Sequence, residues 1–155
     1  MSRVDQFKEQ FRMISSILLD AAKNVPNDKE DWNPEGKGRS AKGILEHMTA
    51  SNLGFSRVIA GKPLSMQVDK TNRKDVAMPA KSFAEAVKNY QRSIESVEKS
   101  MEGLTDKQMF EERTLPWGDV SNAATAMNIV SYHTMYHAGQ LNYMQTLWGD
   151  DEDRL

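Results

Sequence analysis

Ser131-Tyr-His-Thr-Met-Tyr-His-Ala-Gly-Gln140 is the stretch that decides how this chain is interpreted, because it holds two of the only three histidines in 155 residues. His133 and His137 are four positions apart. On an α-helix, residues at this spacing lie one above the other on the same face, so two imidazoles can share one metal ion without bending the backbone. The third histidine, His47, completes a three-nitrogen site only if helix packing brings it opposite the pair.

The stretch lies within a predicted helix from about Ser121 to Trp148. One face of this helix places both histidines among apolar residues: Ala126, Val130, His133, His137, Leu141, Met144 and Trp148. A second face is more aromatic, with Ile129, Tyr132, Tyr136, Gly139 and Tyr143. A helix that is apolar on two sides is either central to a bundle or shared with another subunit. Gly139 costs roughly 1 kcal/mol relative to alanine inside a helix. Its presence suggests that a neighbouring backbone comes close there, or else that the helix simply tolerates it.

Two amphipathic helices are predicted in the first part of the chain. Apolar residues recur at three- and four-residue steps from Val4 to Val25, and Pro26 ends this pattern. Ser40 can cap a second helix that runs to about Ala60. His47 shares the apolar face of the second helix and is therefore expected to point inward. Between these helices, Trp32 stands in a polar loop and is expected to plug the end of the core rather than to stack on a ligand.

A third helix is predicted after a long polar connection. Residues 62–81 look irregular, and twenty extended residues reach about 65 Å, whereas a helix of that length spans about 30 Å. This connection can therefore cross the whole bundle, and the third helix need not be antiparallel to the second. Ser82-Phe-Ala-Glu85 has the pattern of a capping box, and apolar positions follow it to Leu104. Pro-Trp117-Gly then predicts an extended or hairpin-like excursion between Phe110 and Val120.

Length and composition limit the classes of protein. A chain of 155 residues predicts a single domain, 1–155. Its 20 basic and 22 acidic residues give a net charge of −2 and no basic patch for nucleic acid. The absence of cysteine leaves His, Asp and Glu as the metal ligands. Without a signal peptide or a membrane-spanning stretch, we expect a cytoplasmic protein with no membrane partner.

The predicted elements favour an all-α, four-helix bundle, in which metal sites are built from side chains on facing helices. Three imidazoles leave a metal at least one position for water or substrate, and nitrogen ligands suit zinc, nickel, copper or iron. No glutamate lies between the paired histidines, and Glu46 should diverge from His47 by about 100°. With no obvious base, the nucleophile is expected to be metal-bound hydroxide or the thiolate of a cosubstrate.

Three parts of the sequence carry a family resemblance: Asp-Trp32-Asn-Pro34-Glu-Gly36, then Ser40 with Ile-Leu-Glu-His47-Met, then His133-x-x-x-His137-x-Gly139-Gln140. Together they resemble the DinB/YfiT-like family of metal-dependent proteins. The resemblance implies an up-down-down-up bundle with a long crossover between the second and third helices. It also implies a divalent metal on His47, His133 and His137, and a homodimer. Zinc or nickel is the expected ion, with iron or manganese as alternatives.

The relatives in this family include bacillithiol transferases and mycothiol-dependent maleylpyruvate isomerase, so the resemblance also implies a low-molecular-weight thiol as cosubstrate. The first hypothesis is therefore a metal-dependent enzyme that activates such a thiol for S-transfer to a small-molecule substrate. The alternatives are a hydrolase that uses metal-bound water and a non-catalytic, metal-stabilised binding or stress-response protein. No catalytic residue is predicted; Trp117, Tyr136 and Gln140 either shape the substrate mouth or only pack.

Overall fold

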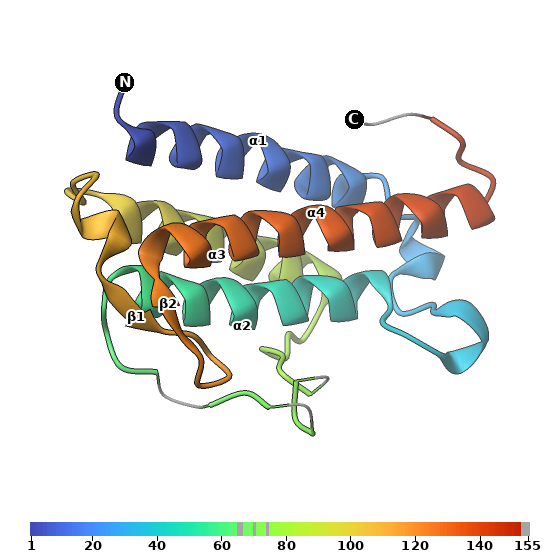
Figure 1. Cartoon of the computed structure of the whole chain (residues 1–155). Helices are drawn as coiled ribbons and strands as arrows, with labels where there is room; N and C mark the ends of the chain where they lie inside the picture. Colours follow the sequence, from blue (N-terminus) through green and yellow to red (C-terminus); the bar gives the residue numbers. More distant parts are fainter. Residues whose placement is uncertain (65–66, 70, 74, 153–155) are drawn as a thin grey trace.

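The computed structural model describes residues 1–64, 67–69, 71–73 and 75–152, and its architecture is mainly helical (Figure 1). This confirms the all-α prediction. The long helices are α1 (Arg3–Lys23), α2 (Ala41–Ile59), α3 (Phe83–Met101) and α4 (Ala123–Leu147). Three short 3-10 turns and a small antiparallel hairpin join them: η1 (Asn27–Lys29), η2 (Pro34–Gly36), η3 (Gln108–Phe110), β1 (Glu112–Thr114) and β2 (Val120–Asn122). The hairpin confirms the predicted excursion before α4.

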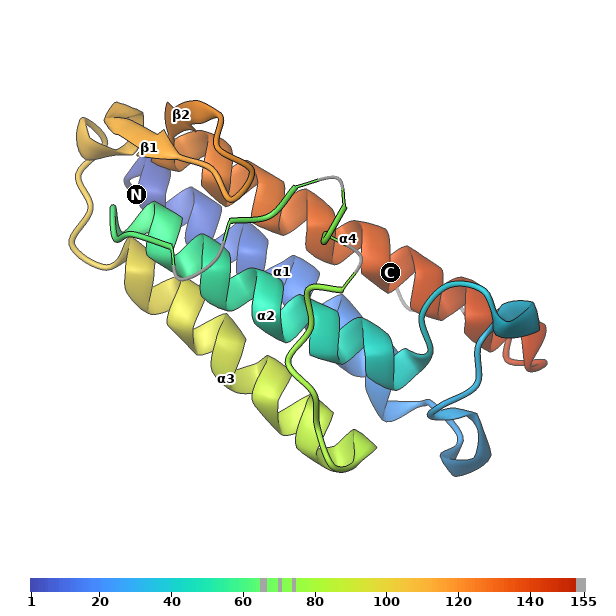
Figure 2. The same cartoon turned by 90° about the horizontal axis from the view of Figure 1, so that it is seen from below.

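The four long helices lie side by side as a bundle. Figures 1 and 2 show α1 and α4 running in one direction and α2 and α3 in the other. The most extensive packing is between α2 and α3 and between α1 and α4, and α2 also packs against α4. Because α2 and α3 are parallel neighbours, the chain must return along the bundle between them. Among its described residues, the connection from 62 to 81 contains no helix or strand, as predicted.

Side-chain caps set where the helices begin, and two of them differ from the sequence prediction. Ser82 accepts the N–H of Glu85 at 3.1 Å, but the Glu85 carboxylate accepts the N–H of Lys81 instead of that of Ser82. The predicted capping box is therefore only half formed. The helix α4 begins two residues later than expected, because Ser121 is paired with Arg113 in the hairpin. Asn122 takes over the cap and accepts the N–H of Thr125 at 2.9 Å.

Two apolar clusters fill the bundle, one toward each end. The first contains Phe11, Phe55 and Met127, and the second contains Leu18, Ile44 and Leu141. Trp32 packs against the second cluster, with its ring edge-to-face on Trp148 at a centroid distance of 5.5 Å. This confirms that Trp32 closes the end of the core. No helix in the described part of the chain has the length and apolarity needed to cross a bilayer.

The aromatic face of α4 points outward. Tyr132, Tyr136 and Tyr143 are 65%, 60% and 64% exposed, because α4 packs on α1 and α2 through its other face. A Cβ placed on Gly139 would meet nothing within 4 Å among the residues that the structure describes. Within the described part of the chain, the prediction of a close neighbouring backbone at Gly139 is therefore wrong and simple tolerance of the glycine fits. The helix α4 is also not central to the bundle. That this face is shared with a second subunit stays a prediction.

Candidate metal centre

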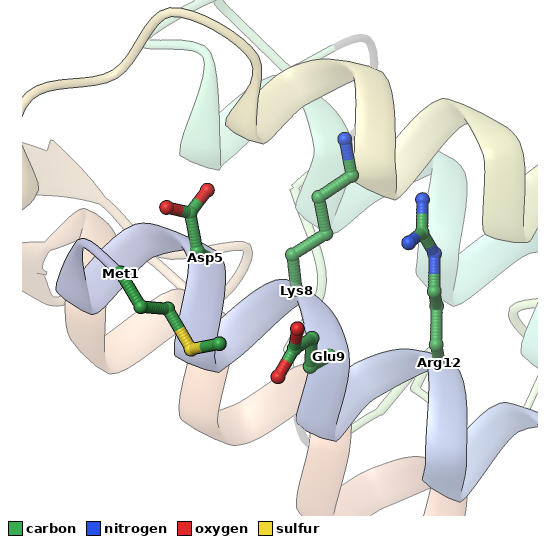
Figure 3. A pocket seen from close by; sticks show the side chains of 5 residues that line it. All are labelled: Met1, Asp5, Lys8, Glu9 and Arg12. Carbon is green, nitrogen blue, oxygen red and sulfur yellow. The ribbon is translucent and has the colours of Figure 1, made fainter.

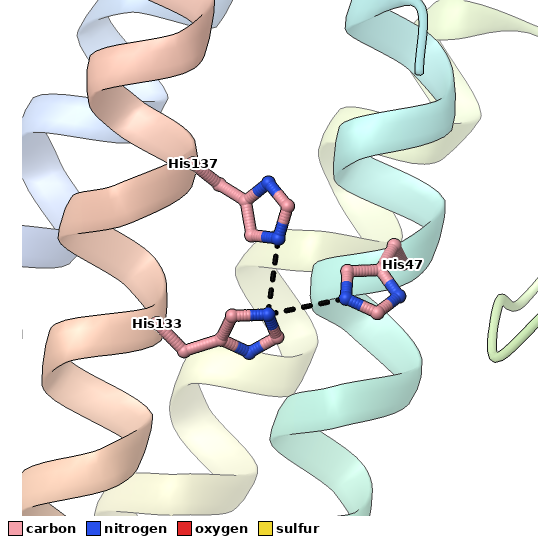
Figure 4. Close-up of side chains that lie close together, drawn as sticks. All are labelled: His47, His133 and His137. Carbon is pink, nitrogen blue, oxygen red and sulfur yellow. Dashed lines mark hydrogen bonds between the residues drawn. The ribbon is translucent and has the colours of Figure 1, made fainter. Parts of the chain in front are cut away.

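The structure brings the three predicted histidines together between α2 and α4 (Figure 4). Nε2 of His133 lies 3.1 Å from Nε2 of His47 and 3.0 Å from Nε2 of His137. The nitrogens that could serve as ligands all lie within 4.8 Å of one another. His47 and His137 are only 8% and 5% exposed, whereas His133 is half-buried and is the one most accessible to a small molecule. We call these three residues the histidine cluster.

Local sequence explains why the imidazoles converge. The Ser40 cap sets the start of α2, and buried Ile44 and Met48 on either side of His47 direct its face toward the interior. On α4, His133 and His137 are one turn apart and therefore share a face. Because these faces meet where α2 packs on α4, convergence requires no bend in either helix.

Hydrogen bonds at the far ring nitrogens orient two of the imidazoles. Nδ1 of His47 donates to the backbone carbonyl of Val76 at 2.6 Å, since a carbonyl can only accept. Nδ1 of His137 lies 2.7 Å from Oε1 of Gln140, whose amide nitrogen donates to the Tyr136 hydroxyl at 2.9 Å. Donation from Nδ1 selects the tautomer whose Nε2 carries a lone pair, which is the form that ligates metals. Both lone pairs are thus available inside the cluster.

The electrostatic environment keeps the cluster neutral at pH 7. Burial lowers the pKa of all three imidazoles, to about 4 for His133 and about 3 for His137. The neighbouring imidazoles lower the pKa of His133 and His137 further, because two like charges so close together would repel. The positive charge of Arg39 acts in the same direction on each of the three. Neutral imidazole is the form a metal requires, so acid would oppose metal binding.

The donor set fits a divalent ion bound by nitrogen. Ligands about 2.0–2.1 Å from a tetrahedral zinc lie roughly 3.3 Å apart, close to the separations from His133. Three protein ligands leave at least one position for a small molecule. The carboxylate of Glu46 accepts the N–H of Ala80 at 2.8 Å, which holds it against the crossover. Glu46 therefore points away from His47, as predicted. Within the described residues, no carboxylate belongs to the cluster.

The other candidate residues divide into two groups. The Tyr136 ring lies 5.0 Å from that of His137, and Gln140 contacts His137 directly, so both border the cluster. Trp117 packs instead on Phe55 at 6.3 Å and donates to Asp119 at 2.8 Å, which supports its packing role. The sequence analysis did not identify Val76 or Arg39. Val76 contributes a backbone carbonyl, which leaves no signal in the sequence, and Arg39 is one cation in a polar loop.

A separate surface groove of about 420 Å³ lies on α1, lined by Met1, Asp5, Lys8, Glu9 and Arg12 (Figure 3). Its two cationic side chains are paired with carboxylates at the end of α3: Lys8 with Glu102 and Arg12 with Glu98. The groove contains none of the three histidines. Its charged side chains belong to a solvated helix face with two partly exposed ion pairs.

Fold and site together define a helix bundle with three imidazole donors gathered between two of its helices. The model of the DinB superfamily matches residues 10–141, which is most of the chain, and the chain belongs to this superfamily. No curated protein matches the sequence.

Solved structures share the fold at low identity. A DinB-like protein from Bacillus subtilis is 18% identical with a TM-score of 0.72, and the match covers 95% of this chain and 94% of that one. A DinB-like protein from Bacillus cereus is 13% identical with a TM-score of 0.67, over 94% and 92% of the two chains. A mycothiol-dependent maleylpyruvate isomerase is 13% identical with a TM-score of 0.69. Its match covers 89% of this chain but only 60% of the isomerase.

Proposed function

We propose that this protein is a metal-dependent enzyme that activates a low-molecular-weight thiol, so that its sulfur attacks an electrophilic small molecule and the whole thiol is transferred. The observation that supports this most is the convergence of three neutral imidazoles with no carboxylate among the grouped ligands of the described residues. A divalent ion bound there, zinc or nickel in the first place, lowers the pKa of a thiol or water in its open position. The similarity in fold to a mycothiol-dependent enzyme supports a thiol cosubstrate.

The residues of the chain have distinct parts in this proposal. His47, His133 and His137 hold the ion. The Val76 carbonyl and the Gln140 amide keep two imidazoles in the ligating tautomer and fix their orientation. Half-buried His133 leaves the cluster accessible from one side, where the thiol and the electrophile would meet.

The lack of a carboxylate in the histidine cluster, as far as the described residues show, favours a thiol over water as nucleophile. A thiol ionises near pH 8.5 in its free form, so it loses its proton far more readily than water does. Hydrolysis in sites of this kind commonly uses a carboxylate base, and Glu46 is engaged with the crossover. A metal-water hydrolase and a non-catalytic binding or stress-response protein are therefore the second and third candidates. The cytoplasmic location and the homodimer also belong to the proposal.

A direct assay can distinguish these candidates. Untagged, metal-loaded protein is incubated with bacillithiol, mycothiol or glutathione and a chloronitrobenzene, and thiol consumption is measured. In the reaction sought, a C–S bond forms, the C–Cl bond breaks, chloride leaves and the thiol proton passes to solvent. We expect at least one thiol to be consumed faster than with His133→Ala. If the wild type consumes none of the three thiols faster than His133→Ala does, the transferase is excluded and the hydrolase or the binding protein is left.

A further inference from the structure

Three hydrogen bonds fasten the end of the crossover to two adjacent residues of α2. Nδ1 of His47 donates to the Val76 carbonyl at 2.6 Å. The backbone carbonyl of Glu46 accepts the N–H of Met78 at 3.0 Å, and its carboxylate accepts the N–H of Ala80 at 2.8 Å. Glu46 and His47 therefore hold three alternate residues of the crossover directly beside a candidate metal ligand.

The segment held in this way, residues 76–80, forms no helix or strand of its own, and we call it the strap. The position of the Val76 carbonyl therefore depends on what the strap is attached to. The two bonds to Glu46 lie two and four residues after Val76 and keep the strap on α2. Ala80 also packs against the second apolar cluster, so the carboxylate bond anchors the strap at the edge of the core.

The Val76 carbonyl determines which ring nitrogen of His47 is free to bind a metal. A carbonyl only accepts, so Nδ1 of His47 must carry the proton and Nε2 keeps its lone pair. Nε2 itself faces the cluster, where it lies 3.1 Å from Nε2 of His133. Loss of an outer partner of this kind typically lowers metal affinity about 10–100-fold. Because α2 supplies only this one imidazole to the cluster, the orientation of His47 decides whether all three ligands meet.

We propose that Glu46 is a positioning residue of the metal centre, which acts on His47 through the strap. Its carboxylate holds Ala80 on α2, and the strap in turn keeps the Val76 carbonyl against Nδ1 of His47. The inference rests on the proposed function, of which it requires only a metal ion on the histidine cluster. It gives the carboxylate next to a metal ligand a positioning role in place of that of a general base. This role needs a hydrogen-bond acceptor on the side chain of Glu46 and no negative charge.

The test separates the hydrogen bond of Glu46 from its charge. Zinc affinity of the untagged protein is measured by competition with a coloured chelator, and hydrogen exchange of the His47 Nδ1 proton is measured by NMR. We expect Glu46→Ala to lower the affinity about tenfold, the low end of the range for outer partners, and to speed this exchange. Glu46→Gln should keep both wild-type values, because its amide oxygen can still accept the Ala80 N–H. The glutamine also removes the electrostatic interaction of Glu46 with Arg39, so loss of charge cannot explain a difference between the two variants.

Glu85→Ala is the matched control, because it removes the carboxylate that accepts the N–H of Lys81 at 2.6 Å, one residue beyond the strap. It should change neither the zinc affinity nor the exchange of the His47 proton. Glu46→Met also lacks an oxygen acceptor and is a good helix former, so it takes the place of Glu46→Ala should that variant fail to fold.

Two results would overturn the role of Glu46: wild-type affinity and exchange in Glu46→Ala, or losses in Glu46→Gln that equal those in Glu46→Ala. Both leave the thiol transferase standing. A wild type that binds zinc but consumes no thiol excludes the transferase alone, because neither measurement on Glu46 involves a thiol. A wild type that binds no zinc overturns the metal centre and, with it, the role of Glu46.

Discussion

Replacing His137 by alanine is expected to lower the zinc affinity of the protein by more than about a hundredfold. Loss of an outer hydrogen-bonding partner of a metal ligand already costs about 10–100-fold, and loss of the ligand itself must cost more. His137 is also one of the two imidazoles whose tautomer is fixed at Nδ1, by Gln140. Competition with a coloured chelator, on protein without a histidine tag, measures the affinity.

The fold itself should survive the His137→Ala change. Alanine has the highest helix propensity, and the site lies in the middle of α4. The metal-free variant should therefore keep the helical circular dichroism of the wild type. Tyr143→Ala, an exposed position on the same helix, is the control and should bind zinc normally. A zinc affinity of His137→Ala within tenfold of the wild type would contradict the assignment of His137 as a ligand.

Replacing Phe11 by alanine is expected to lower the free energy of unfolding by about 3–5 kcal/mol. Phe11 is 0% exposed and belongs to the first apolar cluster, where α1 contributes the ring to a core shared with the other helices. A loss of this size is a large share of the roughly 5–15 kcal/mol that stabilises a typical domain. Urea unfolding followed by circular dichroism measures it. Zinc affinity of the folded protein should not change, because the ligands come from α2 and α4.

The chain offers a matched control for this cavity. Phe110 is 57% exposed at the end of η3, so Phe110→Ala removes the same ring from a surface position. Its cost should stay near the roughly 0.5 kcal/mol that is usual for surface substitutions. Similar losses in the two variants would show that Phe11 does not anchor the core as described.

Much of the fold follows from sequence periodicity. The apolar repeat and the Ser40 cap predicted α2 and the inward direction of His47, because burial of the apolar face fixes the rotation of the helix. Details that depend on competing hydrogen bonds were not predictable in this way. Ser121 has a good capping side chain, but the hairpin pairs it with Arg113, so Asn122 caps α4. The Glu85 carboxylate similarly accepts the backbone N–H of Lys81, whereas a capping box requires that of Ser82.

The site was predictable as far as side-chain type and helical spacing determine it. These features identified His47, His133 and His137, which the structure brings together. Contacts made across the crossover were not predictable, because the path of residues 62–81 has no periodicity. The Val76 carbonyl accepts a hydrogen bond from His47 where the end of this segment is held on α2. There the backbone carbonyl of Glu46 accepts the N–H of Met78, and its carboxylate accepts the N–H of Ala80. Arg39 depends likewise on a loop conformation that composition does not determine.

The most direct test of the central claim is the metal content of the protein purified without a histidine tag. Elemental analysis is expected to find about one divalent ion per chain. Removal of that ion with a chelator should lower the melting temperature, because an ion bound only by the folded state stabilises it. A protein that binds no added zinc or nickel, and whose melting temperature is indifferent to chelator, would contradict the account of the histidine cluster as a metal centre.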